Sequence, residues 1–336
     1  MILVTGGTGL VGAHLLFELA KKNERIRATV RVNSDIRQVR NVFSYYCDQS
    51  KADELFNRID WITADINNIP ALDSAFEGVE FVYHCAALVS FDPSDEKKLR
   101  KINIEGTANI VNLCISHKVK KLCYVSSVAA IGSEKNSSKV DEKTKWNPEN
   151  DHNDYAISKY GAEIEVWRGT QEGVDTVIVN PGIIIGPGFW DSGSGKIFKR
   201  IDKGLNYHFP KVSGFVGVKD VVQAMIELIN SSVKNENFIL VSENLSFEKV
   251  LKETAEYLNK PKPKRQLKKW MIAMGWFFQK IGSFFGAKRE ITRDSINGLF
   301  QETYYDNSKI QDELNFRYTP VCEVLKETAA IFRKEN

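Results

Sequence analysis

Short apolar segments alternate with amphipathic segments through the first half of the chain. The apolar segments resemble strands buried on both faces, and the amphipathic segments repeat apolar residues at helical spacing. The pattern predicts strands over residues 2–5, 26–30, 60–63, 79–85, 121–126 and 175–180, and helices over 11–21, 72–76, 96–117 and 154–172. Strands that alternate with helices need crossover connections. The predicted fold class is therefore α/β, a doubly wound parallel sheet with helices on both faces.

The alternation weakens after Pro181. Residues 186–217 are rich in glycine, serine and aromatic residues and are predicted to form a loop. Beyond them the pattern predicts a strand over 238–241 and helices over 218–231, 247–259, 264–285 and 321–333. We expect two lobes: a larger one of residues 1–182 and 216–244 that contains the sheet, and a smaller, mostly helical one of residues 183–215 and 245–336.

Composition argues against several classes of protein. The 336 residues include 46 basic and 43 acidic ones, a balance that is not typical of a dedicated nucleic-acid binder. The five cysteines form no C-x-x-C pair and the five histidines show no metal-ligand spacing, so neither disulfides nor a metal site are expected. The first strand begins at Ile2, which leaves no room for a signal peptide, and no apolar run reaches the roughly 18 residues of a membrane span. A cytoplasmic protein is expected.

A glycine-rich turn joins the first predicted strand to the first predicted helix. Gly6, Gly9 and Gly12 are spaced three residues apart. In this context the first glycine permits a tight turn, the second lets the backbone approach a pyrophosphate, and the third lets the helix pack closely on the strand. The N–H groups at the start of the helix attract the phosphates. The turn therefore predicts a dinucleotide site, which also includes Thr8, Leu10 and Val11.

The end of the second predicted strand bears on which dinucleotide is bound. An Asp or Glu at this position would bind the ribose 2′-hydroxyl of NAD, but the segment from Arg27 to Arg31 contains no acid. A guanidinium suits a 2′-phosphate, so Arg31, with Arg37 as a second candidate, favours NADP and leaves NAD as the alternative. The competing interpretation is that Arg31 is a solvated surface residue.

A tyrosine and a lysine four residues apart share one face of the helix predicted over 154–172. The Lys159 ammonium would lower the pKa of the Tyr155 hydroxyl, which could exchange a proton with a carbonyl oxygen as hydride moves. Ser126 and Ser127 close the fifth predicted strand, at the edge where active sites of parallel sheets gather, and a hydroxyl there could stabilise an oxyanion. The alternative is an ordinary helix pair beside serines that cap a turn.

In order and spacing, these segments resemble the extended short-chain dehydrogenases/reductases, a superfamily that includes nucleotide-sugar epimerases and dihydroflavonol reductases. The resemblance covers nearly the whole chain. It implies a Rossmann dinucleotide-binding domain for the larger lobe, a substrate-binding role for the smaller one, a small-molecule substrate and a homodimer. The matching segments are Thr5–Gly12, Asp65-Ile66, His84–Ala87, Asn103–Thr107, Val125–Ser127, Tyr155-x-x-x-Lys159, Asn180–Gly182 and Val218–Asp220.

The resemblance also implies a role for each matching residue. Tyr155 would be the general acid/base and Ser127 the catalytic serine, while Lys159 would lower the Tyr155 pKa and bind the nicotinamide ribose. Asn103, in the same catalytic set, would order the active-site end of the sheet. Asp65 and Ile66 would lie beside the adenine, Ala86 and Ala87 beside the fourth strand, and Pro181 and Gly182 near the nicotinamide carboxamide. Ser126 is a further implied cofactor contact.

Departures from the family pattern indicate the branch. Nucleotide-sugar members carry Arg-Pro-x-Asn where this chain has Asn180-Pro-Gly-Ile183, and an Arg where it has Ser213, so a diphosphate would lack its partners. We expect NADPH-dependent reduction of an aldehyde or ketone on a small apolar or aromatic substrate, as in the dihydroflavonol reductase-like and 3β-hydroxysteroid dehydrogenase-like branches. Gly132, where plant flavonoid reductases often carry Asn, disfavours a flavonoid itself. The alternative is an NAD-dependent nucleotide-sugar epimerase or dehydratase; a non-catalytic dinucleotide sensor is disfavoured because both tyrosine and lysine are present.

An aromatic stripe recurs at helical spacing over residues 267–285. It is predicted to be core of the smaller lobe, with a lid over the substrate or a peripheral contact with a membrane as the less favoured alternatives. The stripe consists of Leu267, Trp270, Met271, Met274, Phe277, Phe278, Ile281 and Phe285.

Overall fold

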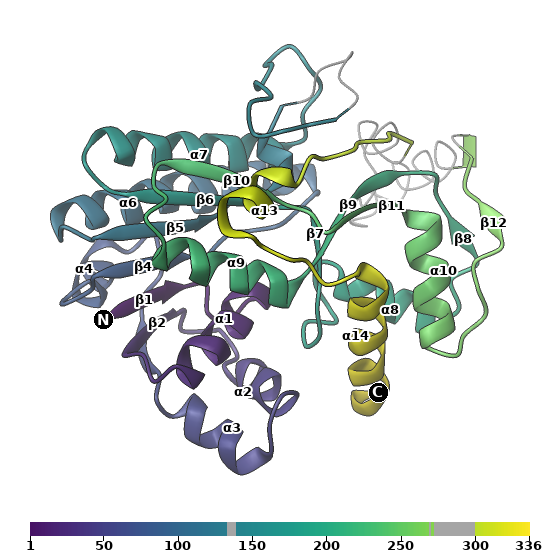
Figure 1. The fold of residues 1–336 in the computed structure, drawn as a ribbon, viewed down its shortest axis with the longest axis horizontal. Helices are drawn as coiled ribbons and strands as arrows, with labels where there is room; N and C mark the ends of the chain where they lie inside the picture. Colours follow the sequence, from purple (N-terminus) through teal and green to yellow (C-terminus); the bar gives the residue numbers. More distant parts are fainter. Residues whose placement is uncertain (133–138, 269, 272–299) are drawn as a thin grey trace.

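A seven-stranded parallel sheet forms the centre of the larger lobe (Figure 1). The computed structural model describes residues 1–132, 139–268, 270–271 and 300–336. The strands follow the order β10-β6-β5-β4-β1-β2-β3, and each neighbouring pair is parallel. The strand order changes direction between β1 and β4, which is the switch point of a doubly wound sheet. The strands are β1 (Ile2–Thr5), β2 (Ile26–Val30), β3 (Asp60–Thr63), β4 (Phe81–His84), β5 (Lys121–Val125), β6 (Thr176–Pro181) and β10 (Glu236–Leu240).

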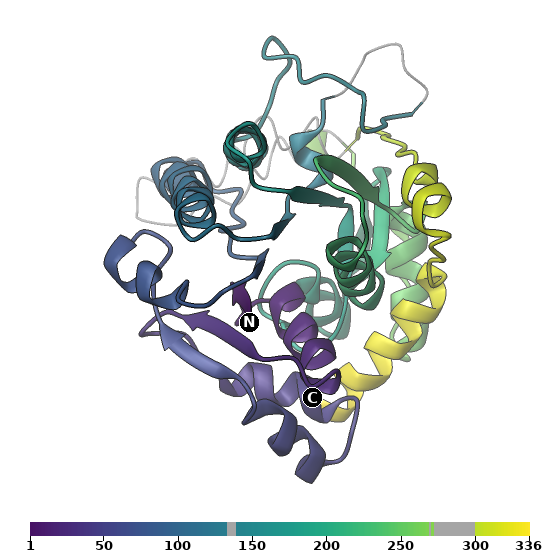
Figure 2. The same cartoon turned by 60° about the vertical axis from the view of Figure 1, so that its left-hand side comes forward.

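Helices cover both faces of this sheet (Figures 1 and 2). Alternate residues of a strand point to opposite faces, so Ile2 and Val4 of β1 join one buried core and Leu3 joins the other. The predicted fold class, a doubly wound α/β sheet, is confirmed. The first core is covered by α1 (Leu10–Lys21), α2 (Arg37–Ser44), α3 (Gln49–Phe56) and α9 (Val218–Asn230), and the second by α4 (Ile69–Ala75), α6 (Gly106–Ser116) and α7 (Asp154–Gln171).

The sequence pattern does not predict α2 and α3, which lie between β2 and β3. Each helix has only eight residues, too few for a clear helical repeat of apolar positions. Their apolar side chains nevertheless enter the first core, where Phe43 lies 5.2 Å from Phe17 and 6.0 Å from Phe56 between ring centres. Tertiary packing, rather than local sequence, therefore stabilises these two helices.

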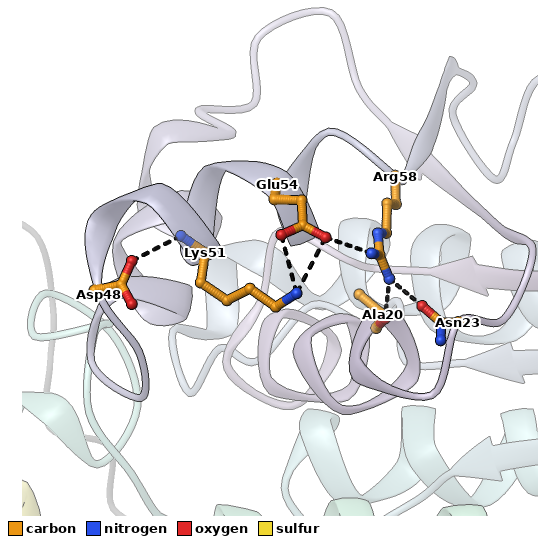
Figure 3. Close-up of polar contacts among 6 residues, drawn as sticks. All are labelled: Ala20, Asn23, Asp48, Lys51, Glu54 and Arg58. Atoms are coloured by element: carbon orange, nitrogen blue, oxygen red, sulfur yellow. Dashed lines mark hydrogen bonds and ion pairs between the residues drawn. The ribbon is translucent and has the colours of Figure 1, made fainter.

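Polar side chains fasten α3 to the end of α1 (Figure 3). The Asp48 carboxylate accepts a hydrogen bond from the backbone N–H of Lys51 at 2.9 Å and caps α3, while the Lys51 amine donates to Glu54 at 2.9 Å. Arg58, just after α3, donates both to Glu54 and to the backbone carbonyl of Ala20, near the end of α1. These contacts are exposed, so they orient α3 more than they stabilise it.

The smaller lobe has a core of its own around a three-stranded sheet of order β11-β9-β7. Strand β9 pairs antiparallel with β11 and parallel with β7. The elements of this region are β7 (Ile183–Ile185), α8 (Gly195–Asp202), β8 (Tyr207–His208), β9 (Val212–Gly217), β11 (Glu243–Ser246), α10 (Phe247–Tyr257), β12 (Arg265–Gln266) and α14 (Val321–Glu335). The short helix α13 (Ser308–Leu314) packs instead on β10, where Ile310 joins the first core of the large sheet.

The predicted loop over residues 186–217 is wrong, because α8, β8 and β9 lie within it. Gly188, Gly193 and Gly204 have positive φ and lie in bends or turns, but Gly214 lies in β9 and serves close packing of strands. A Cβ on Gly182 would lie 2.4 Å from the carbonyl oxygen of Gly214, so β9 passes the end of β6 at a distance that only glycine permits. Glycine and serine therefore mark a buried strand here, although their composition is typical of a loop.

The start of the helix predicted over 264–285 is also wrong, because Arg265 and Gln266 form β12, which pairs with β8. Of the aromatic stripe, only Leu267, Trp270 and Met271 belong to the described residues, and Trp270 is 58% exposed. The rest of the stripe lies outside the described residues, so its assignment to core, lid or surface contact stays a prediction. Within the described ranges, no helix is long and apolar enough to cross a membrane.

The last helix joins the two ends of the chain. Figure 2 shows α14, in yellow, alongside the purple N-terminal helices. The Glu335 carboxylate accepts hydrogen bonds from the Tyr45 hydroxyl at 2.6 Å and from the Trp190 indole N–H at 2.6 Å. Phe332 is 2% exposed and meets the Trp190 ring edge-on at 4.9 Å. Thus α14 packs on the smaller lobe while its end contacts the segment that follows α2.

We expect Phe332→Ala to destabilise the protein by roughly 3–5 kcal/mol, because it removes a buried ring and leaves a cavity. Chemical unfolding followed by circular dichroism measures this change. Lys326→Ala, on an exposed position of the same helix, is the matched control and should change stability by less than about 0.5 kcal/mol. Equal unfolding midpoints for the two variants would contradict the role of α14 in the core.

Candidate active site

The glycine turn packs against the segment that follows β4. Gly6 has φ 70°, and a Cβ there would lie 2.5 Å from the backbone nitrogen of Ala86. A Cβ on Gly12 would lie 2.2 Å from the carbonyl oxygen of Gly6. The protein's own packing therefore requires the first and third glycines. Gly9 differs, since a Cβ there would meet only the Gly6 carbonyl oxygen at 3.5 Å, an ordinary contact.

The space in front of Gly9 therefore fits the approach of a ligand rather than of the protein itself. Gly9 is the N-cap of α1, no side chain caps this helix, and its first turn contains no acidic residue. The free N–H groups of this turn suit an anion such as a pyrophosphate. The predicted contacts Thr8, Leu10 and Val11 are partly exposed around it.

A pocket of about 480 Å³ opens beside the ends of β2 and β3. Arg31 and Asp65, both predicted cofactor contacts, belong to its lining. Asp65 accepts a hydrogen bond from the backbone N–H of Asn67 at 2.9 Å, while Ile66 is buried under Gly106. The full lining is Arg31, Val32, Asn33, Ser34, Thr63, Ala64, Asp65 and Asn68.

The two candidate arginines differ in their contacts. Arg37 donates to both carboxylate oxygens of Asp35, at 2.9 and 2.8 Å. Arg31 is exposed at the rim of the pocket, and no ion pair connects it to another of the described residues. The structure therefore leaves Arg31, rather than Arg37, free to meet an anion in the pocket.

Ser127 and Tyr155 meet at the carboxyl edge of the sheet. Ser127 caps the short 3-10 turn η3 (Val128–Ala130), where its hydroxyl oxygen accepts from the Ala129 N–H at 3.1 Å. The Ser127 side chain also lies close enough to the Tyr155 hydroxyl to affect its pKa. Burial raises the pKa of Tyr155, and the neighbouring Ser127 side chain lowers it by less. Tyr155 therefore keeps its proton at neutral pH.

Lys159 lies one helical turn from Tyr155 but bonds to other groups. Its amine is buried, and it donates to the Tyr124 hydroxyl at 2.6 Å and to the Val125 carbonyl at 2.8 Å. Burial lowers the pKa of Lys159 to about 7. The pKa of Tyr155 is raised, not lowered as the sequence suggests, because burial outweighs the contacts of its hydroxyl.

A chain of buried hydrogen bonds extends behind Lys159. The Tyr124 hydroxyl lies close to Thr107, whose hydroxyl contacts His84 Nε2 at 3.0 Å. His84 Nδ1 in turn contacts the Thr5 hydroxyl at 2.6 Å, and the imidazole stacks on the Tyr124 ring with 5.4 Å between centres. Burial lowers the pKa of His84 to about 3, so its ring is neutral. This chain fixes the Tyr124 hydroxyl that receives the Lys159 bond.

Asn103 lies behind the site, on an irregular turn of helix. The helix predicted over 96–117 is interrupted by the π-helical turn η2 (Arg100–Glu105), between α5 (Glu96–Leu99) and α6. The Asn103 amide accepts from the backbone N–H of Leu88 at 2.7 Å and donates to the Leu88 carbonyl at 3.0 Å. It also donates to the Ser158 hydroxyl at 2.9 Å. Asn103 therefore holds the segment after β4 in place.

That segment carries an exposed apolar patch which the sequence analysis missed. Val89 is 57% and Phe91 58% exposed, and the Phe91 ring meets the Tyr155 ring edge-on at 5.5 Å. Exposed apolar side chains are common, so no signal in the sequence distinguishes these two. The place of Phe91 beside Tyr155, with Val89 two residues before it, makes this exposed pair a candidate for contact with a substrate.

The remaining predicted residues lie along the same edge. The Ser126 hydroxyl donates to Glu163 at 2.6 Å. Pro181 is buried, whereas Ala86 and Gly182 are partly exposed and Ala87 is exposed. Next to them, the side-chain carbonyl oxygen of the buried Asn180 has no hydrogen-bond partner. An unpartnered acceptor at this place fits an amide donor such as a nicotinamide carboxamide.

The chain is similar to known proteins in sequence and in fold. The model of the NAD dependent epimerase/dehydratase family matches residues 2–240. A putative dihydroflavonol 4-reductase of Synechocystis sp. is 29% identical over 350 aligned residues, which cover 99% of this chain and 94% of that protein. The UDP-glucose 4-epimerase of Vibrio cholerae is 27% identical, and the alignment covers 100% of this chain and 96% of that protein. The crystal structure of gox2253 matches with a TM-score of 0.83 and 25% identity, over 100% of this chain and 98% of that one.

The glycine geometry predicts that Gly9→Ala and Gly12→Ala fail for different reasons. Gly9→Ala should leave stability unchanged and weaken dinucleotide binding at least ~10-fold, because the methyl group enters only the ligand's space. Gly12→Ala should lower the unfolding midpoint as well, because its methyl group collides with the Gly6 carbonyl. Thermal unfolding and calorimetric titration with NADPH and NADH measure the two effects. Full dinucleotide affinity in the Gly9 variant would refute a phosphate contact there.

Proposed function

Because the chain belongs to the NAD dependent epimerase/dehydratase family, we propose that it reduces a carbonyl group of a small molecule with NADPH. Its family consists of NAD(P)-dependent oxidoreductases and epimerases. The observation that carries this proposal is the proximity of the Ser127 and Tyr155 side chains, at the sheet edge that also carries the glycine turn. Two hydroxyls that converge there can hold one carbonyl oxygen between them.

The proposed reaction needs a proton at that oxygen. When bound, the reduced nicotinamide supplies the hydride to the carbonyl carbon. Ser127 stabilises the charge that develops on the carbonyl oxygen, and Tyr155 transfers its hydroxyl proton to that oxygen, which gives an alcohol. The Lys159 ammonium stabilises the tyrosinate that remains, and Asn103 keeps the neighbouring segment in position. The raised pKa of Tyr155 means that its hydroxyl holds a proton at neutral pH, before the substrate is reduced.

The preference for NADPH rests on Arg31. Its guanidinium lies at the rim of the pocket that contains Asp65, without a carboxylate partner among the described residues. A 2′-phosphate would supply that partner through charge-assisted hydrogen bonds. The remaining proposed cofactor contacts are Gly6, Thr8, Gly9, Leu10, Val11, Gly12, Ile66, Ala86, Ala87, Ser126, Lys159, Pro181 and Gly182.

An apolar or aromatic carbonyl compound is the proposed substrate. Phe91 and Val89 offer exposed apolar surface beside Tyr155. Asn180 and Ser213, which stand where nucleotide-sugar enzymes carry arginine, are 0% and 7% exposed and bring no positive charge for a diphosphate. The Synechocystis relative, a putative dihydroflavonol 4-reductase, supports the same branch. The similarity to the Vibrio epimerase supports the alternative function, an NAD-dependent epimerase or dehydratase of a nucleotide sugar. Such an enzyme would retain bound NAD through purification.

The proposal includes the wider organisation of the molecule. Residues 1–182 and 216–244 would bind the dinucleotide, and residues 183–215 and 245–336 would bind the substrate. We also propose that the protein forms a homodimer and is cytoplasmic. The five free cysteines support a reducing compartment.

Tyr155→Phe should lower kcat about 10²- to 10⁴-fold, because the substrate oxygen loses its proton donor. NADPH affinity and unfolding midpoint should stay unchanged, since only one oxygen atom is removed. NADPH consumption with a panel of aldehydes, ketones and nucleotide sugars measures the rate. Tyr160→Phe makes the same change on α7 and should retain full activity, because Tyr160 stacks on Trp146, at 4.3 Å, away from Ser127. Near wild-type turnover by the Tyr155 variant would rule out the proposed acid.

Arg31→Ala should weaken NADPH binding at least ~10-fold and leave NADH binding unchanged, because a charge-assisted bond to phosphate contributes about 1.5–3 kcal/mol. Calorimetric titration with both cofactors measures the difference. Arg40→Ala is the matched control, because Arg40 is paired with Asp53 and should not affect either affinity. If the unmutated protein binds NADPH and NADH equally, the preference for NADPH is wrong.

A further inference from the structure

A carboxyl group is buried behind the proposed catalytic residues. Glu163 follows Lys159 by one turn of α7 and is only 7% exposed. Burial of an acid is costly unless hydrogen bonds or an opposite charge compensate the lost water. The hydrogen bonds that the described residues make to Glu163 all come from neutral groups. No pattern in the sequence distinguishes this glutamate from the exposed acids of the same helix.

The hydrogen bonds to Glu163 define its charge state. The Ser126 hydroxyl donates to one carboxylate oxygen at 2.6 Å, and the Asn180 side-chain amide donates to the same oxygen at 2.9 Å. An amide N–H can only donate, so these contacts fit an ionised carboxylate, which can only accept. Burial raises the pKa of Glu163, and the neighbouring Ser126, Asn180 and Trp167 side chains oppose that effect.

Glu163 also controls the backbone that carries the proposed catalytic serine. Ser126 directly follows β5, and Asn180 lies in β6, so the carboxylate ties two neighbouring strand ends together. The Asn180 amide donates a second bond to the Ser127 carbonyl at 3.1 Å. A chain of two hydrogen bonds therefore runs from Glu163 through Asn180 to the backbone of Ser127.

The same carboxylate acts on Lys159 through its charge. Burial keeps the neighbouring His84 neutral and keeps Cys85 and Tyr124 in their protonated forms, because each pKa moves away from neutrality. Attraction by Glu163 favours the charged form of Lys159 and opposes the effect of burial. The titratable groups around Lys159 are His84 on β4, Cys85 after it, Tyr124 on β5, and Tyr155 and Glu163 on α7.

We propose that Glu163 is a positioning residue for the proposed catalytic set. Its carboxylate fixes the ends of β5 and β6 that carry Ser127, and its negative charge keeps the Lys159 amine in the ammonium form. The link to catalysis rests on the proposed function. The charge of Lys159, in contrast, is a property of the protein alone and is measurable without cofactor or substrate.

A pH titration of Lys159 tests this proposal. The ¹⁵Nζ chemical shift is followed in lysine-labelled protein without cofactor, and Lys159→Arg identifies the signal. Wild-type Lys159 is charged below a midpoint near its pKa of about 7 and neutral above it. Glu163→Gln should move that midpoint down by about one pH unit, because the attraction is lost while burial remains. Glu163→Asp keeps the charge and should stay close to the wild-type midpoint.

Two further variants complete the titration. Glu165→Gln makes the same chemical change on α7, at a residue paired with Arg168, and should leave the Lys159 midpoint unchanged. Glu163→Met removes the charge from a side chain of similar volume and replaces Glu163→Gln if that variant does not fold. An unchanged midpoint after the carboxylate is removed overturns the proposal.

The pH dependence of the reaction provides a second readout. With an aldehyde or ketone that the wild-type protein reduces, kcat should fall as pH rises and the ammonium is lost, and Glu163→Gln should move this fall to lower pH. A lower kcat with an unchanged pH profile would show a purely structural role and also overturn the proposal. If wild-type protein reduces no carbonyl compound, the proposed function fails, while the titration of Lys159 still decides the role of Glu163.

Discussion

The Lys159 amine is buried, since the residue is only 1% exposed. The groups at the surrounding edge of the sheet provide the contacts that stabilise it there. A buried ammonium needs oxygen acceptors, and β5 provides two of them through the Tyr124 hydroxyl and the Val125 carbonyl. The Tyr124 hydroxyl is itself fixed by the chain through Thr107 and His84. These groups come from separate strands and helices, and they meet because the carboxyl ends of parallel strands lie at one edge.

Close contact between backbone segments is the second requirement of this edge. Gly6 approaches Ala86 near the switch point of the large sheet, and Gly182 approaches Gly214 where the chain leaves that sheet for the smaller lobe. A side chain at Gly6 or Gly182 would push apart segments that position the site. Because β6 carries Asn180 and leads directly into β7, the smaller sheet is aligned with the same strand ends that hold Ser127.

The sequence predicts those parts of the molecule that depend on local pattern. Buried parallel strands are recognisable as apolar runs, and the glycine turn and the Tyr155–Lys159 pair depend on spacing alone. The strand β9 was mistaken for a loop because its glycines serve a contact with a distant segment. The position of Glu163 depends on partners 37 and 17 residues away along the chain, Ser126 and Asn180, so no local pattern reveals it. The same holds for Phe91, whose meaning comes from its neighbour Tyr155.

The contact between Glu335 and Tyr45 has a consequence for the order in which the protein is made. The two residues are 290 positions apart, and the ribosome releases Tyr45 long before Glu335. Domains generally begin to fold during synthesis, from the N-terminal side. The large sheet becomes complete once β10 has emerged, but α14 and its bond to Tyr45 must wait for residue 335. Until then the aromatic residues Tyr45 and Trp190 lack this partner on the nascent chain, so the contact between them and Glu335 forms only after both lobes have been synthesised.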